Sequence, residues 1–224
     1  MIQAVVFDLW NTLVFNPRGN PFDALKEVAH TPEEAKRFEE HVMRTRYPSI
    51  EEARHHGPAL SFRSSELEKG WIHDVKASDS EVALFHDTFA CLQETISLVR
   101  LGLLTNTQSF GLQFLDRLSL SSQIPHRFVS AEIGLTKPDP AIFQYVQKHL
   151  GLFPGDLVMV GDTWNDDIEG ALSAGWSAIW LNRKRRPLPR HDLGLDFAEI
   201  HSLEALPGVI RNLQAGLRCA QCLG

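Results

Sequence analysis

The sequence predicts an α/β protein: a doubly wound parallel sheet interrupted by a helical insertion. Five short apolar runs lack the alternation of strands with one wet face, which is typical of parallel strands buried on both faces. Loop residues and segments with helical spacing separate these runs, and such a β-α-β rhythm indicates a parallel sheet covered by helices. From about Pro17 to Leu92 the rhythm stops, and charged sequence with loosely helical spacing takes its place.

Each element follows from its own stretch of sequence. The expected strands are Ala4 to Phe7, Leu101 to Thr105, Arg127 to Ser130, Leu157 to Gly161 and Ala178 to Leu181, with a sixth at Phe197 to Ile200. The expected helices are Phe110 to Leu118, Pro140 to Leu150, Asp166 to Ala174 and a final helix to about Leu217. Residues 1–16 and 93–224 therefore form the predicted core, residues 17–92 the insertion, and residues 218–224 a short tail.

Composition narrows the classes of function. The chain has 224 residues, 43% of them apolar, and a formal charge of −6. A protein that neutralises nucleic-acid phosphates usually carries a basic excess, so we expect no nucleic-acid partner. The sequence has no basic leader before an apolar run and no apolar run of about 20 residues, so we expect a soluble, cytoplasmic protein without membrane contact.

The three cysteines are too few for a disulfide scaffold. Cys219 and Cys222 form a C-x-x-C pair near the C-terminus, but a structural zinc site needs four ligands and no second pair follows. The pair is interpreted as reduced thiols of the tail, with a weak metal or redox role as the alternative.

Polar side chains follow the predicted strands at the edge where parallel sheets bind ligands. They are Asp8 after the first strand, Thr105 and Asn106 after the second, Lys137 after the third, and Asp162, Asp166 and Asp167 after the fourth. Alone, each has an ordinary structural explanation, since Asp caps helices and Thr, Asn and Lys are common in turns and on surfaces. Their ordered appearance at successive strand ends instead indicates one shared site.

The chemistry of this set suits attack on phosphorus. Crowded carboxylates repel one another unless a cation joins them, and a hard divalent ion such as Mg²⁺ would satisfy Asp8 and Asp162. With the charge neutralised, a carboxylate can act as a nucleophile and form an acyl phosphate that water hydrolyses. Lys137 would balance the remaining negative charge, while Thr105 and Asn106 would hold phosphoryl oxygens.

Four segments resemble the motifs of the haloacid-dehalogenase-like (HAD) superfamily. They are Val5 to Leu13, Leu103 to Asn106, Lys137 to Pro140 with Phe143, and Gly161 to Asp167. The resemblance implies a Rossmann-like core and a helical cap inserted between the first two motifs, with hinges near Asn16 to Gly19 and Cys91 to Glu94. It further implies a hydrolase whose partner is a small, anionic substrate.

The resemblance also implies a role for each matching residue. Asp8 is expected to be the nucleophile, Thr105 and Asn106 phosphate ligands, Lys137 the charge-balancing cation, and Asp162 a metal ligand. Asp167 is expected to steady either the waters of the metal or Lys137. Trp10 is expected to offer the metal its backbone carbonyl, and both Trp10 and Asn11 are expected beside the substrate.

The sequence departs from the family pattern at Trp10, where related phosphatases carry an Asp that protonates the leaving group. General acid–base help is typically worth a factor of about 10² to 10⁴. Three alternatives therefore stay open: a magnesium-dependent phosphatase with altered leaving-group preference, a 2-haloacid dehalogenase using Arg44 or Arg46, and a non-catalytic phosphate-binding protein. The basic run from Asn182 to Arg186, with Arg190 beyond it, is either a solvated loop or an attractor of anionic substrate.

Overall fold

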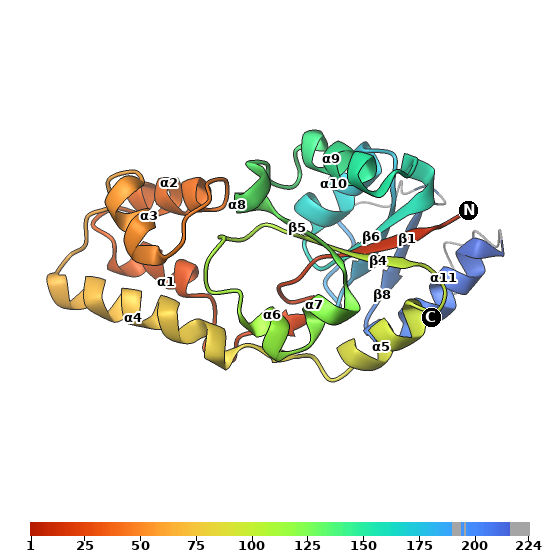
Figure 1. Ribbon diagram of the computed structural model, residues 1–224, viewed down its shortest axis with the longest axis horizontal. Coiled ribbons are helices and arrows are strands. Elements are labelled where there is room, and N and C mark those ends of the chain that lie inside the picture. Colours follow the sequence, from red (N-terminus) through yellow and green to blue (C-terminus); the bar gives the residue numbers. More distant parts are fainter. Residues whose placement is uncertain (190–193, 195, 216–224) are drawn as a thin grey trace.

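The computed structural model describes residues 1–189, 194 and 196–215. Its main sheet has six parallel strands in the order β5-β4-β1-β6-β7-β8 (Figure 1). The strands are β1 (Ala4–Phe7), β4 (Arg100–Thr105), β5 (His126–Val129), β6 (Leu157–Gly161), β7 (Ser177–Leu181) and β8 (Phe197–Ile200). The predicted doubly wound parallel sheet is confirmed, with each strand within one residue of its expected bounds.

Alternate side chains of the strands supply two separate cores. In β1, Val5 and Phe7 join a cluster with residues of α5 (Thr88–Thr95) and α11 (Leu206–Gln214). Ala4 and Val6 join the opposite cluster, with α9 (Pro140–Leu150) and α10 (Gly170–Ser173). Figure 1 shows these helix pairs on the two faces of the sheet. Burial on both faces explains why the strands read as continuous apolar runs.

The insertion consists of α1 (Pro21–Val28), α2 (Pro32–Val42), α3 (Ile50–His56) and α4 (Ser65–Glu81). The Asn, Thr or Ser residue that precedes each helix accepts a hydrogen bond from the first turn, as is typical of helix starts. The helices share a third apolar cluster around Phe22, Phe38 and Trp71. Because this cluster is separate from those of the sheet, the insertion has a core of its own. Figure 1 shows its helices to one side of the sheet.

A two-stranded antiparallel ribbon, β2 (Val14–Phe15) with β3 (Ala83–Leu84), joins the insertion to the sheet. Strands of two residues are too short to give a periodic signal, and the sequence analysis missed them. The expected first hinge, Asn16 to Gly19, follows β2 directly. The expected second hinge, Cys91 to Glu94, lies within α5, where Cys91 and Leu92 are buried in the sheet's core.

Two predicted helices differ from the structure. The prediction of a helix from Phe110 is wrong at its start: α6 covers only Phe114–Arg117, and a second short helix, α7, covers Leu120–Gln123. Phe110 instead packs into the insertion's cluster, and the Asp79 carboxylate of α4 accepts a hydrogen bond from the Phe114 N–H at 2.8 Å. The segment predicted as one helix from Asp166 is a π-helical turn, Trp164–Glu169, that continues into α10.

No helix among residues 1–189, 194 and 196–215 is both long and apolar enough to cross a membrane. The last described helix, α11, ends at Gln214. The predicted extension to about Leu217, the tail and the pair Cys219 and Cys222 lie outside the described residues. Cys91 is a free, buried thiol, and burial raises its pKa to about 12, so it stays protonated.

Candidate active site

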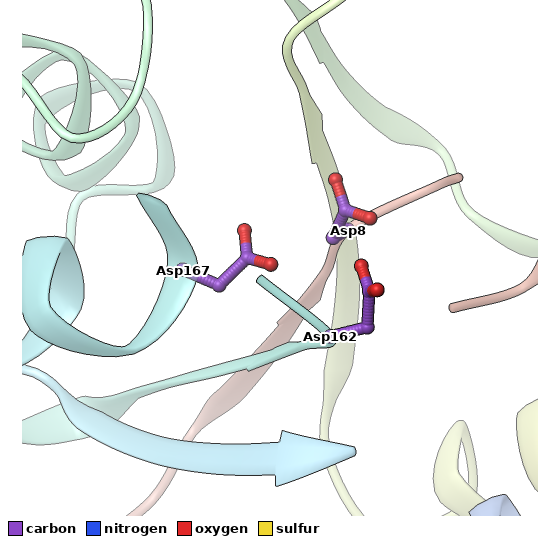
Figure 2. A group of neighbouring side chains, drawn as sticks. All are labelled: Asp8, Asp162 and Asp167. Atoms are coloured by element: carbon purple, nitrogen blue, oxygen red, sulfur yellow. The ribbon is translucent and has the colours of Figure 1, made fainter. Parts of the chain in front are cut away.

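Three carboxylates meet where adjacent strands end. Strand β1 lies between β4 and β6, so Asp8 and Asp162, which follow β1 and β6, are neighbours at the carboxyl edge of the sheet. The Asp8 N–H extends this pairing by donating to the Val160 carbonyl at 2.8 Å. One oxygen each of Asp8, Asp162 and Asp167 lies within 4.8 Å of the others (Figure 2). The predicted convergence of these residues is thus present.

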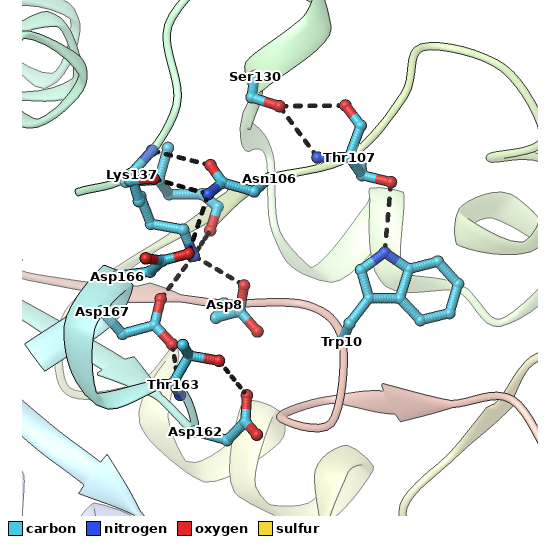
Figure 3. A network of polar contacts seen from close by, with 11 residues as sticks. Asp8, Trp10, Asn106, Thr107, Ser130, Lys137, Asp162, Thr163, Asp166 and Asp167 are labelled. Atoms are coloured by element: carbon cyan, nitrogen blue, oxygen red, sulfur yellow. Dashed lines mark hydrogen bonds and ion pairs between the residues drawn. The ribbon is translucent and has the colours of Figure 1, made fainter. Parts of the chain in front are cut away.

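Lys137 connects two of the carboxylates. Its Nζ donates to Asp8 Oδ1 at 2.8 Å, to Asp167 Oδ1 at 2.6 Å and to the Leu104 carbonyl at 3.0 Å (Figure 3). Only 4% of Lys137 is exposed. An ammonium group has three donors, and all three are used here. Lys137 therefore fixes one oxygen of Asp8, while Asp8 Oδ2 forms no hydrogen bond with any described residue.

The electrostatics indicate a shortage of positive charge. Burial and the charge of Asp8 raise the pKa of Asp162 to about 6. Burial also raises the pKa of Asp167, although the nearby Lys137 opposes this. Burial alone would lower the pKa of Lys137, but attraction to Asp167 and Asp8 raises it overall, so the ammonium stays charged. One ammonium among three carboxylates leaves two negative charges, which suits a divalent cation.

Gly161 permits the position of Asp167. A Cβ atom on Gly161 would lie 2.2 Å from Asp167 Oδ2, so any other residue would displace this carboxylate. The same Oδ2 accepts the Thr163 N–H at 2.9 Å, while Oδ1 is bound by Lys137. Both oxygens of Asp167 are thus engaged by the protein. Of the two roles expected for Asp167, this geometry favours the one that steadies Lys137.

Asp162 is positioned through its main chain. Its carbonyl accepts hydrogen bonds from Trp180 Nε1 at 3.0 Å and from Arg186 Nη2 at 2.7 Å. Its Oδ1 accepts a bond from the Thr163 hydroxyl at 3.2 Å. Asp162 is half-buried, whereas Asp8 and Asp167 are buried. This arrangement agrees with the expected role of metal ligand.

Asn106 holds the loop of Lys137. Its Oδ1 accepts the Lys137 N–H at 2.8 Å, and its Nδ2 donates to the Lys137 carbonyl at 2.9 Å and to Asp166 Oδ2 at 3.3 Å (Figure 3). The amide was expected to bind phosphate, but these contacts make it a positioning group. If Asn106 binds phosphate as predicted, its backbone N–H is the group that remains for this role.

Thr105 carries a buried hydroxyl without a partner. The residue is fully buried at the end of β4, and its Oγ1 forms no hydrogen bond with the described residues. A buried polar group left unpaired costs free energy, and a bound ligand, water or ion is one way to satisfy it. The orphaned hydroxyl fits the predicted role of Thr105 as a ligand of a phosphoryl oxygen.

Trp10 directs its side chain away from Asp8. Its Nε1 donates to Thr107 Oγ1 at 3.3 Å, and its ring packs on Phe114 at a centroid distance of 5.4 Å. Figure 3 shows the indole leaning toward Thr107 rather than toward Asp8. Asn11 follows with a φ of 59° and exposes its side chain. The structure thus places no acid–base group at the position of Trp10.

A cleft of about 350 Å³ lies between the sheet edge and the insertion. Trp10, Asn11 and Asn106 line it from the sheet, and Asn20 and Met43 line it from the insertion. The predicted substrate-side residues Trp10 and Asn11 are therefore both in its wall. Arg44 and Arg46, the candidates for binding halide or carboxylate, are exposed and lie outside this lining.

Several residues that support the site were not predicted from the sequence. Ser130 Oγ donates to the Thr107 carbonyl at 3.1 Å and accepts the Thr107 N–H at 3.0 Å, which fixes the residue that holds Trp10. Arg183, interpreted as part of a solvated or substrate-attracting run, instead binds the buried Asp87 with both terminal nitrogens, at 2.8 and 2.9 Å. A single Ser, Thr or Asp in a loop forms no sequence pattern. Of these residues, only Arg183 could be singled out, because it lies in a basic run.

The fold and the site together define a class of protein: an α/β enzyme with a lysine-bridged carboxylate cluster at its sheet edge and a helical insertion beside it. Residues 2–175 match the family model of haloacid dehalogenase-like hydrolases. The chain belongs to this family, and the predicted resemblance is confirmed.

Two relatives in sequence are named phosphatases. Over 140 residues the chain is 34% identical to N-acylneuraminate-9-phosphatase of Homo sapiens, covering 59% of this chain and 54% of that protein. The chain thus spans about half the length of this relative. It is 29% identical over 234 residues to glyceraldehyde 3-phosphate phosphatase of Methanopyrus kandleri, covering 95% of this chain and 99% of that protein.

Solved structures share the fold. A 2-haloacid dehalogenase from Pseudomonas syringae pv. Tomato has a TM-score of 0.68 at 22% identity, covering 95% of this chain and 100% of that chain. A HAD phosphatase from Thermococcus onnurineus has a TM-score of 0.61 at 24% identity, covering 97% and 100%. At these identities the likeness concerns the fold alone.

Proposed function

We propose that this hydrolase is a magnesium-dependent phosphatase that acts on a small phosphorylated metabolite through an aspartyl-phosphate intermediate. The observation that carries the proposal is the cluster of Asp8, Lys137 and Asp167 beside the unpartnered hydroxyl of Thr105. Asp8 as nucleophile and Lys137 as fixed cation thus meet at the sheet edge, and Thr105 ends the neighbouring strand β4. Phosphatases among the relatives support the same reaction type.

The donor set fits Mg²⁺. Asp8 and Asp162 offer hard carboxylate oxygens within 4.8 Å of each other, and burial, together with the charge of Asp8, raises the pKa of Asp162. The proposed ligands are Asp8, the Trp10 carbonyl and Asp162, with Asp167 acting through Lys137. Bound there, the ion would neutralise charge on the transferred phosphoryl group.

The protein's own groups account for the proposed chemistry. Lys137 holds Asp8 Oδ1, which leaves Oδ2 free to attack phosphorus as the bond to the leaving-group oxygen breaks. Water then attacks the acyl phosphate, which restores the Asp8 carboxylate and releases inorganic phosphate. Thr105 and the Asn106 N–H would hold phosphoryl oxygens in both steps.

Trp10 determines which esters react well. Without an acid at this position, an alkoxide leaving group must depart without a proton from the usual donor. The missing help corresponds to a factor of about 10² to 10⁴, or roughly 3–5 kcal/mol of barrier. Esters with acidic leaving groups, such as aryl phosphates, need little protonation and should be the better substrates.

The decisive experiment measures p-nitrophenyl phosphate hydrolysis with Mg²⁺ and with EDTA, for the natural protein and for Asp8→Asn. We expect turnover that requires Mg²⁺ and disappears in the variant, which keeps the shape of Asp8 without its nucleophilic charge. A turnover equal to that of Asp8→Asn would contradict the proposal.

The aromatic residue at position 10 favours one other activity, that of a 2-haloacid dehalogenase, because a halide needs no proton to leave. Release of halide from a 2-halocarboxylate in the presence of EDTA would support this alternative over the phosphatase. If the protein turned over neither substrate while phosphate raised its melting temperature, the non-catalytic phosphate-binding alternative would stand.

The insertion is proposed to be a cap over the substrate. It lines one wall of the cleft, and Tyr47 exchanges two hydrogen bonds of 2.8 Å with Ser109 Oγ across the boundary. The β2–β3 ribbon connects it to the sheet at both ends, so we place the cap at residues 17–82 rather than 17–92. Motion about this ribbon would admit substrate and then exclude water.

A further inference from the structure

Lys184 is the only lysine or arginine among the described residues that line the cleft. It belongs to the basic run after β7. None of the roles proposed above makes a residue of this run a substrate ligand. Its side chain is exposed, whereas Lys137 is buried and spends all three donors on Asp8, Asp167 and the Leu104 carbonyl. A second anionic group on a substrate would therefore have to find its cation elsewhere, and Lys184 is in place.

The turn that carries Lys184 is fixed on its N-terminal side by Arg183. The Arg183 guanidinium binds both oxygens of buried Asp87 and donates to the Thr12 carbonyl at 3.0 Å. It also stacks on Phe85, 4.0 Å from the ring centroid. Arg183 thus joins this turn to the segment after β3 and to Thr12. Thr12 directly follows Trp10 and Asn11, which line the cleft.

The same turn is fixed on its other side by Asn182. The buried Asn182 amide accepts the Arg186 N–H at 2.9 Å and donates to the Arg186 carbonyl at 2.7 Å and to Glu199 Oε1 at 2.6 Å. The Asn182 carbonyl accepts the Arg185 N–H at 3.0 Å. Hydrogen bonds on both flanks thus hold the backbone of the turn beside the cleft, which reduces the backbone ordering that ligand binding would require.

The lining of the same cleft also contains neutral hydrogen-bond donors. Asn16 and Asn20 each use Oδ1 to accept a backbone N–H, from Arg18 and Phe22 respectively, which leaves the amide N–H groups to donate. The one carboxylate in the lining, Asp23, lies in the first turn of α1, where the helix dipole favours a negative charge. One cation and several amide donors form a suitable environment for a carboxylate with neighbouring hydroxyl groups.

We propose that Lys184 is a specificity-determining residue that binds a carboxylate at the end of the substrate remote from the phosphoryl group. Among alkyl esters, the preferred substrates are then phosphate monoesters of small hydroxycarboxylic acids. This inference rests on the proposed phosphatase function, and it names the substrate class of that same site.

The test compares two esters of the same skeleton, 3-phosphoglycerate and glycerol 3-phosphate, which differ by a carboxylate in place of a hydroxymethyl group. We expect the natural protein to have a kcat/KM at least about tenfold higher for 3-phosphoglycerate, as is typical of a charge-assisted contact. Lys184→Gln should remove most of this ratio, mainly through KM. Arg185→Gln is the matched control, because it removes the same charge one residue away, outside the cleft lining.

The result that overturns the inference is an unchanged ratio in Lys184→Gln, or an equal loss of the ratio in Arg185→Gln. Equal loss would mean that the run attracts anions only at long range. Failure of the proposed function shows separately, as p-nitrophenyl phosphate turnover no faster than that of Asp8→Asn. In that case the two esters are compared by the melting temperature of Asp8→Asn with and without Lys184→Gln, and a carboxylate-specific shift that needs Lys184 still supports the inference.

Discussion

The ion pair between Asp87 and Arg183 should be a principal source of stability. Asp87 is 2% exposed and accepts bonds from Arg183 Nη1 and Nη2, Ser202 Oγ and the Leu203 N–H, at 2.8 to 2.9 Å. Asp87→Asn keeps the shape of the side chain but removes the charge that Arg183 faces. Because 18% of the Arg183 side chain reaches solvent, we expect the lower end of the usual range for a broken buried pair, about 3 kcal/mol.

The pH dependence gives an independent check. Burial opposes ionisation of Asp87, but its bonds from Arg183, Leu203 and Ser202 lower its pKa from the usual 3.8 to about 2. Since the pKa is lower in the folded state, the stabilisation is fully present above about pH 4 and is lost as the pH falls toward 2. The difference in unfolding free energy between the natural protein and Asp87→Asn should shrink over that window.

Urea unfolding followed by circular dichroism at pH 7 and at steps down to pH 2.5 measures both quantities. Glu40→Gln is the control, since the Lys36–Glu40 pair is exposed and its loss should cost no more than about 0.5 kcal/mol. If Asp87→Asn changes the unfolding free energy as little as this control, the assigned role of the pair is wrong. A difference that stays constant down to pH 2.5 would refute the electrostatic explanation.

Three further predictions follow from contacts at the site. Gly161→Ala should displace Asp167 and lower aryl-phosphate turnover by at least about tenfold, whereas Gly155→Ala, with nothing within 4 Å of the added Cβ, should not; equal rates would contradict this. Trp10→Asp should raise turnover on alkyl phosphates, by at most the roughly 10² to 10⁴ of general acid catalysis, and an unchanged rate would place the limiting step elsewhere. Asp87→Asn should reduce the preference for 3-phosphoglycerate in the natural background but not in Lys184→Gln, as a four-variant cycle of kcat/KM would show.

Much of the sheet was predictable because burial on both faces leaves a direct trace in sequence. Runs such as Leu157 to Gly161 are apolar throughout, and the polar residue after each run must lie at the carboxyl edge. The order of strands, which the structure supplies, places β1 beside β6 and so brings Asp8 and Asp162 together. Lys137 follows β5, which β4 separates from β1, so its meeting with Asp8 also depends on the loop after α8 (Ser130–Ile133).

What could not be predicted depends on contacts between distant segments. Phe110 leaves its expected helix because the insertion offers a buried site, and the roles of Asn106 and Arg183 depend on partners that no local pattern specifies. Nothing in the sequence shows that Asn106 turns its amide toward the Lys137 main chain. Specific polar contacts of this kind are set by tertiary packing, whereas apolar periodicity is set by burial.

The site divides its positive charge between two loops with different tasks. Lys137 is buried, has its three donors occupied and is held by Asn106, so it can fix Asp8 but cannot reorient toward different substrates. Lys184 is exposed on a turn anchored by Arg183, and it is Arg186 of the same turn, not Lys184, that contacts the cluster, through the Asp162 carbonyl. Because the two cations share no contact in these networks, changes in substrate preference need not alter the nucleophile. Trp10 lines the same cleft as Lys184, and its indole gives that cleft an apolar wall at the position where the family pattern has an acid.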